Sequence, residues 1–283
     1  KLSEAKPVAV KALLLSSVGV IFTAALTTVF CFFVLKIKLL ESMLIGAVMS
    51  STDAASVFSV LRSKNLNLKY NTASMLEMES GSNDPFAYML TVIVLSFMKG
   101  ENSVGQMVYS IVAQIVFGVL IGFLIALGAV WFMKHFTFNT SGFDAAFVLG
   151  VAVLAYALPT LVGGNGYLSA YIVGIVLGNQ NIHNKKSLVH FFDGMTGLMQ
   201  MLIFFLLGLL SFPSKILTVL LPSIFIALFI TFVARPLAVA TVLAPFKTKI
   251  SQYLVVSWAG LRGAASIVFA IMAMVGGVTM EQD

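Results

Sequence analysis

Long apolar stretches follow one another along the chain, and the charged and polar residues lie mostly in the short segments between them. A helix needs roughly 20 apolar residues to cross the hydrocarbon core of a bilayer, which is about 30 Å thick. The short alternating strands of a membrane β-barrel are not visible in this pattern. The sequence therefore predicts nine transmembrane helices, at residues 8–35, 40–62, 73–98, 104–133, 143–161, 165–180, 189–211, 215–244 and 250–277.

Composition supports a chain that is solvated by lipid. Of the 283 residues, 59% are hydrophobic and only 10% are charged, which differs strongly from a soluble domain. The net charge of +6 comes from cations that stand singly or in pairs between apolar stretches, so nucleic acid is not an expected partner. We expect an all-α, multi-pass protein of the cell (inner) membrane, surrounded by the lipid bilayer.

The distribution of lysine and arginine indicates how the helices are oriented. If all nine stretches cross, one side of the membrane receives Lys1, Lys6, Lys11, Arg62, Lys64, Lys69, Lys134, Lys185, Lys186, Lys247 and Lys249. The other side receives Lys36, Lys38, Lys99 and Lys215. Because cytoplasmic loops are enriched in basic residues, we expect the N-terminal end of the chain in the cytoplasm. A re-entrant loop at 165–180 is the alternative for that short stretch, but it would remove the charge bias.

Function is expected at ionisable residues inside the apolar stretches, because each is costly at the bilayer centre unless it is paired or hydrated. Asp53, Asp84 and Arg262 each stand near the middle of a predicted helix. They therefore lie at about the same depth on three different helices. Carboxylate, hydroxyl and carbonyl oxygens suit small hard cations, and the sequence contains no Cys/His cluster for a transition metal.

Within the stretch 73–98, the spacing decides which side chains share a face. Ser80 and Asp84 are four residues apart and lie on one face, where both can contribute oxygens to one site. Glu79 and Asn83 share a second face, about 100° away around the helix. We therefore expect Glu79 to lie one level below the oxygens of Asp84 and Ser80, nearer to the cytoplasm.

Residues that disturb helices occur beside the same positions. A Ser-Ser-Thr run at 50–52 precedes Asp53 and competes for backbone hydrogen bonds, and Pro85 removes a backbone donor. Two glycines loosen the last helix at 260–263. In transporters built from inverted repeats, two broken helices cross near the midplane of the membrane and form the substrate site. The helices that contain Asp53 and Arg262 are the natural pair.

Simpler interpretations stand beside the functional ones. An intramembrane aspartate or arginine can be half of a structural ion pair and nothing more. The dipeptide Arg235-Pro236 is predicted to end or kink its helix and to pair locally rather than to bind substrate. A gated cation channel and an intramembrane aspartyl protease also place acidic residues at this depth, although the Gly-x-Gly-Asp element of such proteases is absent.

Three segments carry a resemblance to a known family: Ser-Thr-Asp-Ala-Ala at 51–55, Glu-Ser-Gly-Ser-Asn-Asp-Pro at 79–85 and Gly-Leu-Arg-Gly at 260–263. Together they resemble the signature segments of the monovalent cation/proton antiporters of the NhaP-type branch. The residues around Asp84 are most similar to the cell-volume-regulation potassium/proton group. The resemblance implies a thirteen-helix inverted-repeat fold with crossing discontinuous helices, of which the nine stretches are the fourth to the twelfth.

Function and assembly follow from the same resemblance. It implies a secondary active antiporter, not an enzyme, that exchanges K⁺ or Na⁺ for H⁺ by alternating access and needs no cofactor. Residues 1–283 would form a single transmembrane transport domain that is incomplete, because the N-terminal helices and the last helix are missing. A homodimer is expected. Glu79 and Arg262 are expected to pair and to orient the crossing helices.

Carried over residue by residue, the resemblance makes Asp84 the principal carrier of the monovalent cation and of the proton. Asp53, Ser80 and the backbone around Thr52 are expected to complete the site. Proton and cation are then alternative occupants of one place. Asn83 stands where electrogenic relatives have a second acid, so the resemblance implies an electroneutral exchange of one cation for one proton.

Overall fold

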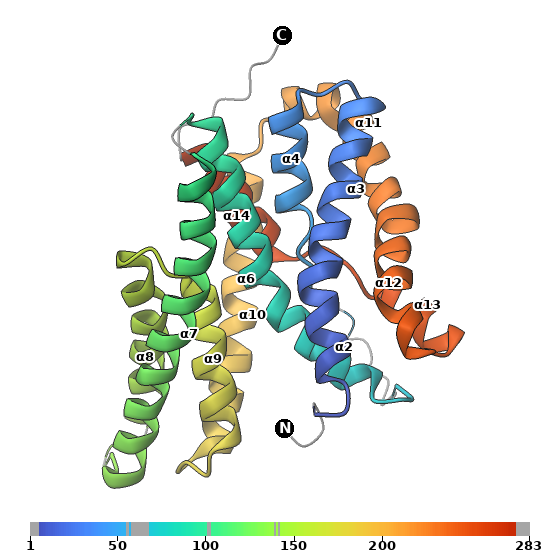
Figure 1. Ribbon diagram of the computed structural model, residues 1–283. Coiled ribbons are helices and arrows are strands. Elements are labelled where there is room, and N and C mark those ends of the chain that lie inside the picture. The colour runs from blue at the N-terminus through green and yellow to red at the C-terminus, as the bar shows by residue number, and fades with distance from the viewer. Residues whose placement is uncertain are drawn as a thin grey trace. The chain divides into compact units, whose positions relative to one another are not determined.

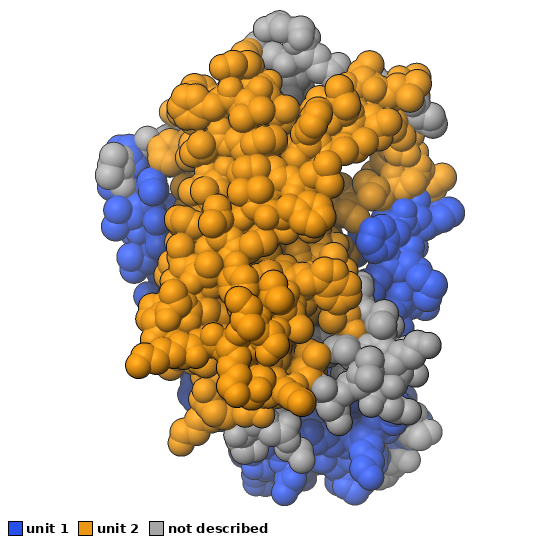
Figure 2. All heavy atoms as spheres, turned by 90° about the vertical axis from the view of Figure 1, so that its right-hand side faces the viewer, with its two compact units in different colours: residues 1, 103–206 blue, residues 2–102, 207–283 orange. Residues whose placement is uncertain are grey.

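All regular secondary structure in the part of the chain that the structure describes is helical (Figure 1). The structure, a computed structural model, describes residues 6–54, 57, 68–100, 103–138, 140 and 142–275. The chain divides into two compact units, which Figure 2 distinguishes by colour. Unit 1 consists mainly of residues 103–206, and unit 2 of residues 2–102 and 207–283.

The N-terminal half of unit 2 begins with one long apolar helix. It consists of α2 (Ala9–Leu14), the π-helical turn η1 (Leu15–Gly19) and α3 (Val20–Phe33). The shorter helix α4 (Leu39–Val48) packs against α3, and the two lie side by side in Figure 1. The next described helix, α6 (Thr72–Met98), packs against both α2 and α4.

The C-terminal half of unit 2 repeats this order of elements. A long helix with a π-helical turn comes first, and an interrupted helix follows it. The elements are α11 (Pro213–Phe229), η2 (Ile230–Ala234), α12 (Arg235–Leu243), the 3-10 turn η3 (Ala244–Phe246), α13 (Ile250–Trp258) and α14 (Ala264–Val275). Apolar side chains from both halves form one core, which includes the buried residues Leu15, Met75, Leu76, Val239 and Val256.

Unit 1 contains the remaining helices: α7 (Val104–His135), α8 (Phe143–Leu161), α9 (Gly166–Asn179) and most of α10 (Lys185–Leu210). Helix α7 starts at a capping box, in which the Ser103 hydroxyl accepts from the Gln106 N–H and the Gln106 side chain accepts from the Ser103 N–H. Such reciprocal bonds satisfy backbone donors that the first turn of a helix leaves free. The helix therefore begins one residue after its polar cap.

Two of the predicted helices are interrupted in their middle, as their polar and glycine residues indicated. Helix α4 ends at Val48, and residues 51–54 are not helical. Helix α13 ends at Trp258, and residues 260–263 separate it from α14. The expected disturbance at Pro85 does not occur, because α6 continues through this residue to Met98. A proline removes only one backbone donor, and a helix inside a membrane protein tolerates this loss where neighbours surround it.

Every predicted apolar stretch contains described helix, but nine crossings are not confirmed. Among the described residues, five helices are long and apolar enough to cross a membrane: Ala9–Phe33, Gly105–His135, Phe143–Leu161, Lys185–Leu210 and Ile216–Phe246. Three apolar helices are shorter: Leu39–Val48, Gly166–Asn179 and Ala264–Val275. Helix α6 carries the polar segment 79–84, which lowers its hydropathy. Residues 55–56, 58–62 and 276–277 of the predicted helices lie outside the described residues.

A test of this packing uses Gly46, which faces α3. A Cβ atom at this position would meet the carbonyl oxygen of Ala24 and would lie 2.6 Å from the Thr28 hydroxyl. Alanine gains about 1 kcal/mol in helix propensity over glycine, but overpacking costs about 1–3 kcal/mol, and here the obstacle includes backbone. We predict that Gly46→Ala lowers the thermal unfolding temperature of the detergent-solubilised protein.

The matched control is Gly128→Ala in α7, since a Cβ at Gly128 has no neighbouring atom within 4 Å. This variant should be at least as stable as the wild type. An unfolding temperature of Gly46→Ala equal to that of the control would contradict the close approach of α3 and α4.

Candidate functional site

The non-helical segments of the two interrupted helices, residues 51–54 and 260–263, are hydrogen-bonded to each other. The N–H of Asp53 donates to the carbonyl oxygen of Leu261 at 2.8 Å. In the opposite direction, Nη1 of Arg262 donates to the carbonyl oxygen of Ser51 at 3.0 Å. Each interruption therefore satisfies part of the backbone hydrogen-bonding capacity of the other. The structure brings together the two segments that the sequence singled out as a pair.

Helix α6 contacts the first interruption through the face that contains Ser80 and Asp84. The Ser51 hydroxyl donates to Oδ1 of Asp84. The Ser80 hydroxyl donates to the carbonyl oxygen of Thr52 at 3.2 Å and accepts from the N–H of Ala54 at 3.1 Å. The spacing of four residues thus places both side chains against residues 51–54. Ser51 was not assigned a role from the sequence, although it belongs to the run of hydroxyl residues before Asp53.

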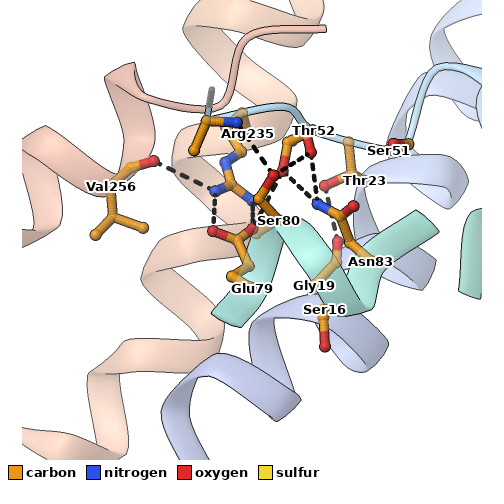
Figure 3. A network of polar contacts seen from close by, with 12 residues as sticks. Ser16, Gly19, Thr23, Ser51, Thr52, Glu79, Ser80, Asn83, Arg235 and Val256 are labelled. Carbon is orange, nitrogen blue, oxygen red and sulfur yellow. Dashed lines mark hydrogen bonds and ion pairs between the residues drawn. The ribbon is translucent and has the colours of Figure 1, made fainter. Parts of the chain in front are cut away.

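The second face of α6 also reaches this segment, through Asn83 (Figure 3). The Asn83 side chain is completely buried. Its amide nitrogen donates to the hydroxyl of Thr52 and, at 3.0 Å, to the carbonyl oxygen of Thr52. Its carbonyl oxygen, Oδ1, is buried and has no hydrogen-bond partner. The amide therefore fixes Thr52 and leaves one acceptor atom unused.

Glu79, one turn before Asn83, forms a bidentate ion pair with Arg235, as Figure 3 shows. Nη1 of Arg235 lies 2.8 Å from Oε1, and Nη2 lies 3.0 Å from Oε2. The two side chains are only 3% and 2% exposed. Nη2 also donates to the carbonyl oxygen of Val256 at 3.3 Å. The pair thereby connects α6, α12 and α13.

This pairing corrects the expectation that Glu79 pairs with Arg262. Both carboxylate oxygens of Glu79 accept from Arg235, whereas Arg262 donates to the carbonyl oxygen of Ser51. Depth along a helix was known from the sequence, but the direction of each side chain around it was not. The signal for Arg235 was available, since an arginine within a long apolar stretch is costly unless it is paired.

Arg262 and Asp53 lie at the ends of helices whose dipoles favour their charges. Arg262 donates to Ser51, which follows the C-terminal end of α4, where positive charge is stabilised. The carboxylate of Asp53 lies against Gly263, immediately before the first residue of α14, where negative charge is stabilised. Nε and Nη2 of Arg262 are buried and have no hydrogen-bond partner.

These contacts place oxygen ligands around one partly buried carboxylate, that of Asp84. Asp84, Ser80 and the carbonyl group of Thr52 share one region of unit 2, and Asp53 follows Thr52 directly. Within the described part of the chain, no group of three or more His, Cys, Asp and Glu residues could hold a metal ion. The donor set consists of hard oxygens, which suits an alkali cation or a proton better than a transition metal.

Interrupted apolar helices that meet beside partly buried carboxylates are typical of helical membrane transporters. The chain belongs to the sodium/hydrogen exchanger transmembrane family, which matches residues 1–282.

Relatives agree with this membership. The chain is 37% identical over 278 residues to the K(+)/H(+) antiporter NhaP2 of Shewanella sp. (strain ANA-3), a match that covers 96% of this chain and 47% of that protein. It is 35% identical over 271 residues to the K(+)/H(+) antiporter NhaP of Alkalimonas amylolytica, which covers 95% of this chain and 47% of the relative. The chain therefore spans about half the length of these curated relatives.

The fold is also similar to a solved structure, that of the sodium proton antiporter MjNhaP1 from Methanocaldococcus jannaschii at pH 8. The TM-score is 0.82, and the match covers 92% of this chain and 67% of the other. At 24% sequence identity this likeness concerns the fold alone.

The buried ion pair generates a prediction about stability. Arg235→Ala leaves the carboxylate of Glu79 buried without its partner, which costs roughly 3–5 kcal/mol. Arg262→Ala removes one recorded hydrogen bond from a charged donor, worth about 1.5–3 kcal/mol. Thermal unfolding in detergent should therefore show a larger loss for Arg235→Ala than for Arg262→Ala.

A double variant controls for loss of packing. Combining Arg235→Ala with Glu79→Ala removes both charges, so part of the stability lost in Arg235→Ala should return. Strictly additive losses in the two single variants would contradict the pairing of these residues.

Proposed function

We propose that this chain is part of a secondary active antiporter that exchanges K⁺ or Na⁺ for H⁺. The observation that carries the proposal is the position of Asp84. This carboxylate lies on a continuous helix and accepts a hydrogen bond from Ser51 in the interrupted segment of another. A cation or a proton bound there contacts two elements that can move relative to each other. Membership in an exchanger family argues against the cation channel and the protease that the sequence left open.

In this proposal Asp84 is the carrier, and Asp53, Ser80 and the carbonyl oxygen of Thr52 complete the cation site. Asn83 holds Thr52 in place through its amide nitrogen, and its side-chain oxygen is buried without a hydrogen-bond partner. Binding of a cation requires an ionised carboxylate, while protonation neutralises the same group. Proton and cation therefore exclude each other, and this competition couples the two fluxes.

The charges around the site support a stoichiometry of one to one. Asp53, Asp84 and Glu79 provide three carboxylates, and Arg235 and Arg262 provide two guanidinium groups. With all five groups ionised, one negative charge remains. Either one proton or one monovalent cation neutralises it, so the loaded and the protonated site have equal charge. Asn83 does not titrate, so it adds no further charge to this count.

The arrangement around the site fits an inverted-repeat transporter. Two long helices with a π-helical turn each precede an interrupted helix, once in residues 9–54 and once in residues 213–275. Such a repeat, with its two interruptions in contact, supports alternating access by movement of one bundle against another. We further propose nine membrane crossings, a single incomplete transport domain at 1–283, a homodimer and a cytoplasmic N-terminal end of the chain in the cell (inner) membrane.

Removal of the carrier is the direct test. Asp84→Asn in the full-length protein should abolish exchange, because a side-chain amide neither takes up a proton near neutral pH nor neutralises the charge of a cation. The fold should persist, since asparagine has the same size and its oxygen can still accept from Ser51. Exchange is measured in vesicles by the response of a pH dye to added Na⁺ or K⁺, and folding by gel filtration.

The matched control is Glu77→Gln, which removes a carboxylate from an exposed position of the same helix. It should exchange at the rate of the wild type. Substantial residual exchange by Asp84→Asn would rule out Asp84 as the carrier.

Charge balance gives a second prediction. Because the loaded and protonated sites have equal charge, the membrane potential should not shift the equilibrium of the exchange. In proteoliposomes with a potential set by an ionophore for an ion that is not transported, the steady-state cation gradient should follow the pH gradient alone. A cation gradient that changes with the imposed voltage would exclude one-to-one exchange and would require a second proton carrier, Asp53 or Glu79.

A further inference from the structure

We propose that Gly260 and Gly263 are positioning residues whose missing side chains provide the space for Arg235 and Asp53. Through this space, Gly263 sets the position of the Asp53 carboxylate and with it the affinity for the transported cation. The second statement rests on the function proposed above, whereas the first concerns the structure alone.

The surroundings of Gly263 are filled by Asp53. A Cβ atom on Gly263 would meet Cβ of Asp53 and would lie 2.5 Å from its Oδ2 and 2.7 Å from its Cγ. Contacts of this length do not occur in folded proteins, so the side chain of Asp53 would have to move. The backbone of Asp53 cannot simply withdraw, because its N–H donates to Leu261, two residues before the glycine. The carboxylate therefore depends on the absence of a side chain at 263.

In the same way, the side chain of Arg235 occupies the space beside Gly260. A Cβ atom on Gly260 would lie 2.5 Å from Nε, 2.9 Å from Cδ and 3.0 Å from Cγ of Arg235. This part of the arginine is its rigid middle, since the guanidinium group is held by Glu79 and by the carbonyl oxygen of Val256. The backbone end of Arg235 is fixed because this residue is the first of α12. An added methyl group would therefore displace a side chain that is constrained on both sides.

Conformational freedom does not explain these two glycines. Among the described residues, glycines with a positive φ are Gly100, Gly142 and Gly163, and Cβ atoms at these three positions would have no neighbour within 4 Å. Gly260 and Gly263 show the opposite combination, since neither has a positive φ and both face a side chain at close range. Alanine could adopt their backbone conformation, so space is what the two positions require.

The segment 260–263 thus makes four contacts, which fix residues 51–53 and Arg235. The carbonyl oxygen of Leu261 and the guanidinium group of Arg262 bond to residues 51–53, and the two glycines receive Asp53 and Arg235. As a consequence, the direction of the Asp53 carboxylate depends on the other interrupted helix. A small shift at Gly263 changes the geometry of the proposed cation site without touching Asp84.

The experiment compares Gly263→Ala with Gly128→Ala in the full-length protein. For Gly263→Ala we expect the apparent KM for the cation to rise about tenfold, which corresponds to about 1.4 kcal/mol, with the maximal rate changed less than the KM. Gly128→Ala, at an open position, should leave both parameters at the wild-type values. An unchanged KM for Gly263→Ala overturns the assigned effect on affinity.

A cycle of stability measurements tests the space itself and requires no transport. The thermal unfolding temperature is measured for Gly263→Ala, for Asp53→Gly and for the double variant. Because Asp53→Gly removes the obstructing side chain, the added methyl group should cost little in that background, and the effects should not be additive. Additive losses overturn the proposal. If Gly263→Ala does not fold, the double variant is compared with Asp53→Gly alone, and failure of the double variant to fold also overturns it.

The two measurements separate this inference from the proposed function. If the wild-type protein shows no cation/proton exchange, the proposed function fails, and the stability cycle still decides whether Gly263 provides the space for Asp53. If exchange is present and the cycle is additive, the positioning role fails while the antiport function stands.

Discussion

A helix that stops inside a membrane leaves backbone N–H and C=O groups that lipid cannot satisfy, and the arrangement of unit 2 follows from this constraint. The N–H of Asp53 is satisfied by Leu261, and the N–H of Ala54 by Ser80. The carbonyl oxygen of Thr52 accepts from both Ser80 and Asn83. Ser80 and Asn83 therefore satisfy backbone groups that the interruption leaves free. Asp84 differs from these residues, because it accepts a hydrogen bond from the Ser51 hydroxyl and not from a backbone group.

The ion pair of Glu79 and Arg235 adds geometry more than net stability. Burying two charges costs several kcal/mol each, and their attraction roughly offsets this cost. Their bidentate contact nevertheless fixes the rotation of α6 relative to α12, because both oxygens and both terminal nitrogens are used. With α6 fixed in this way, Ser80 and Asp84 face residues 51–54. The pair thus determines which face of α6 is available to a cation.

The sequence contained enough information to locate the site but not to assign all of its contacts. Helical spacing placed Ser80 and Asp84 on one face, and the polar run before Asp53 marked the interruption of a helix. The predicted pairing of Glu79 with Arg262 was wrong. Two arginines lay on different apolar stretches, and only tertiary packing decides which of them turns towards Glu79. Pro85 suggested a break that the packed surroundings of α6 do not require. The division into two units depends on contacts between distant helices, which no local pattern records.

The π-helical turn at Ile230–Ala234 directly precedes Arg235. Such a turn is equivalent to one extra residue inserted into an α-helix, and each residue turns a helix by about 100°. Without that insertion, the register of α11 would turn Arg235 by about 100° away from Glu79. The turn contains no charged residue, so its contribution lies in the number of its residues and not in their charge. A deletion within this uncharged stretch would therefore be as damaging to the ion pair as loss of a charge.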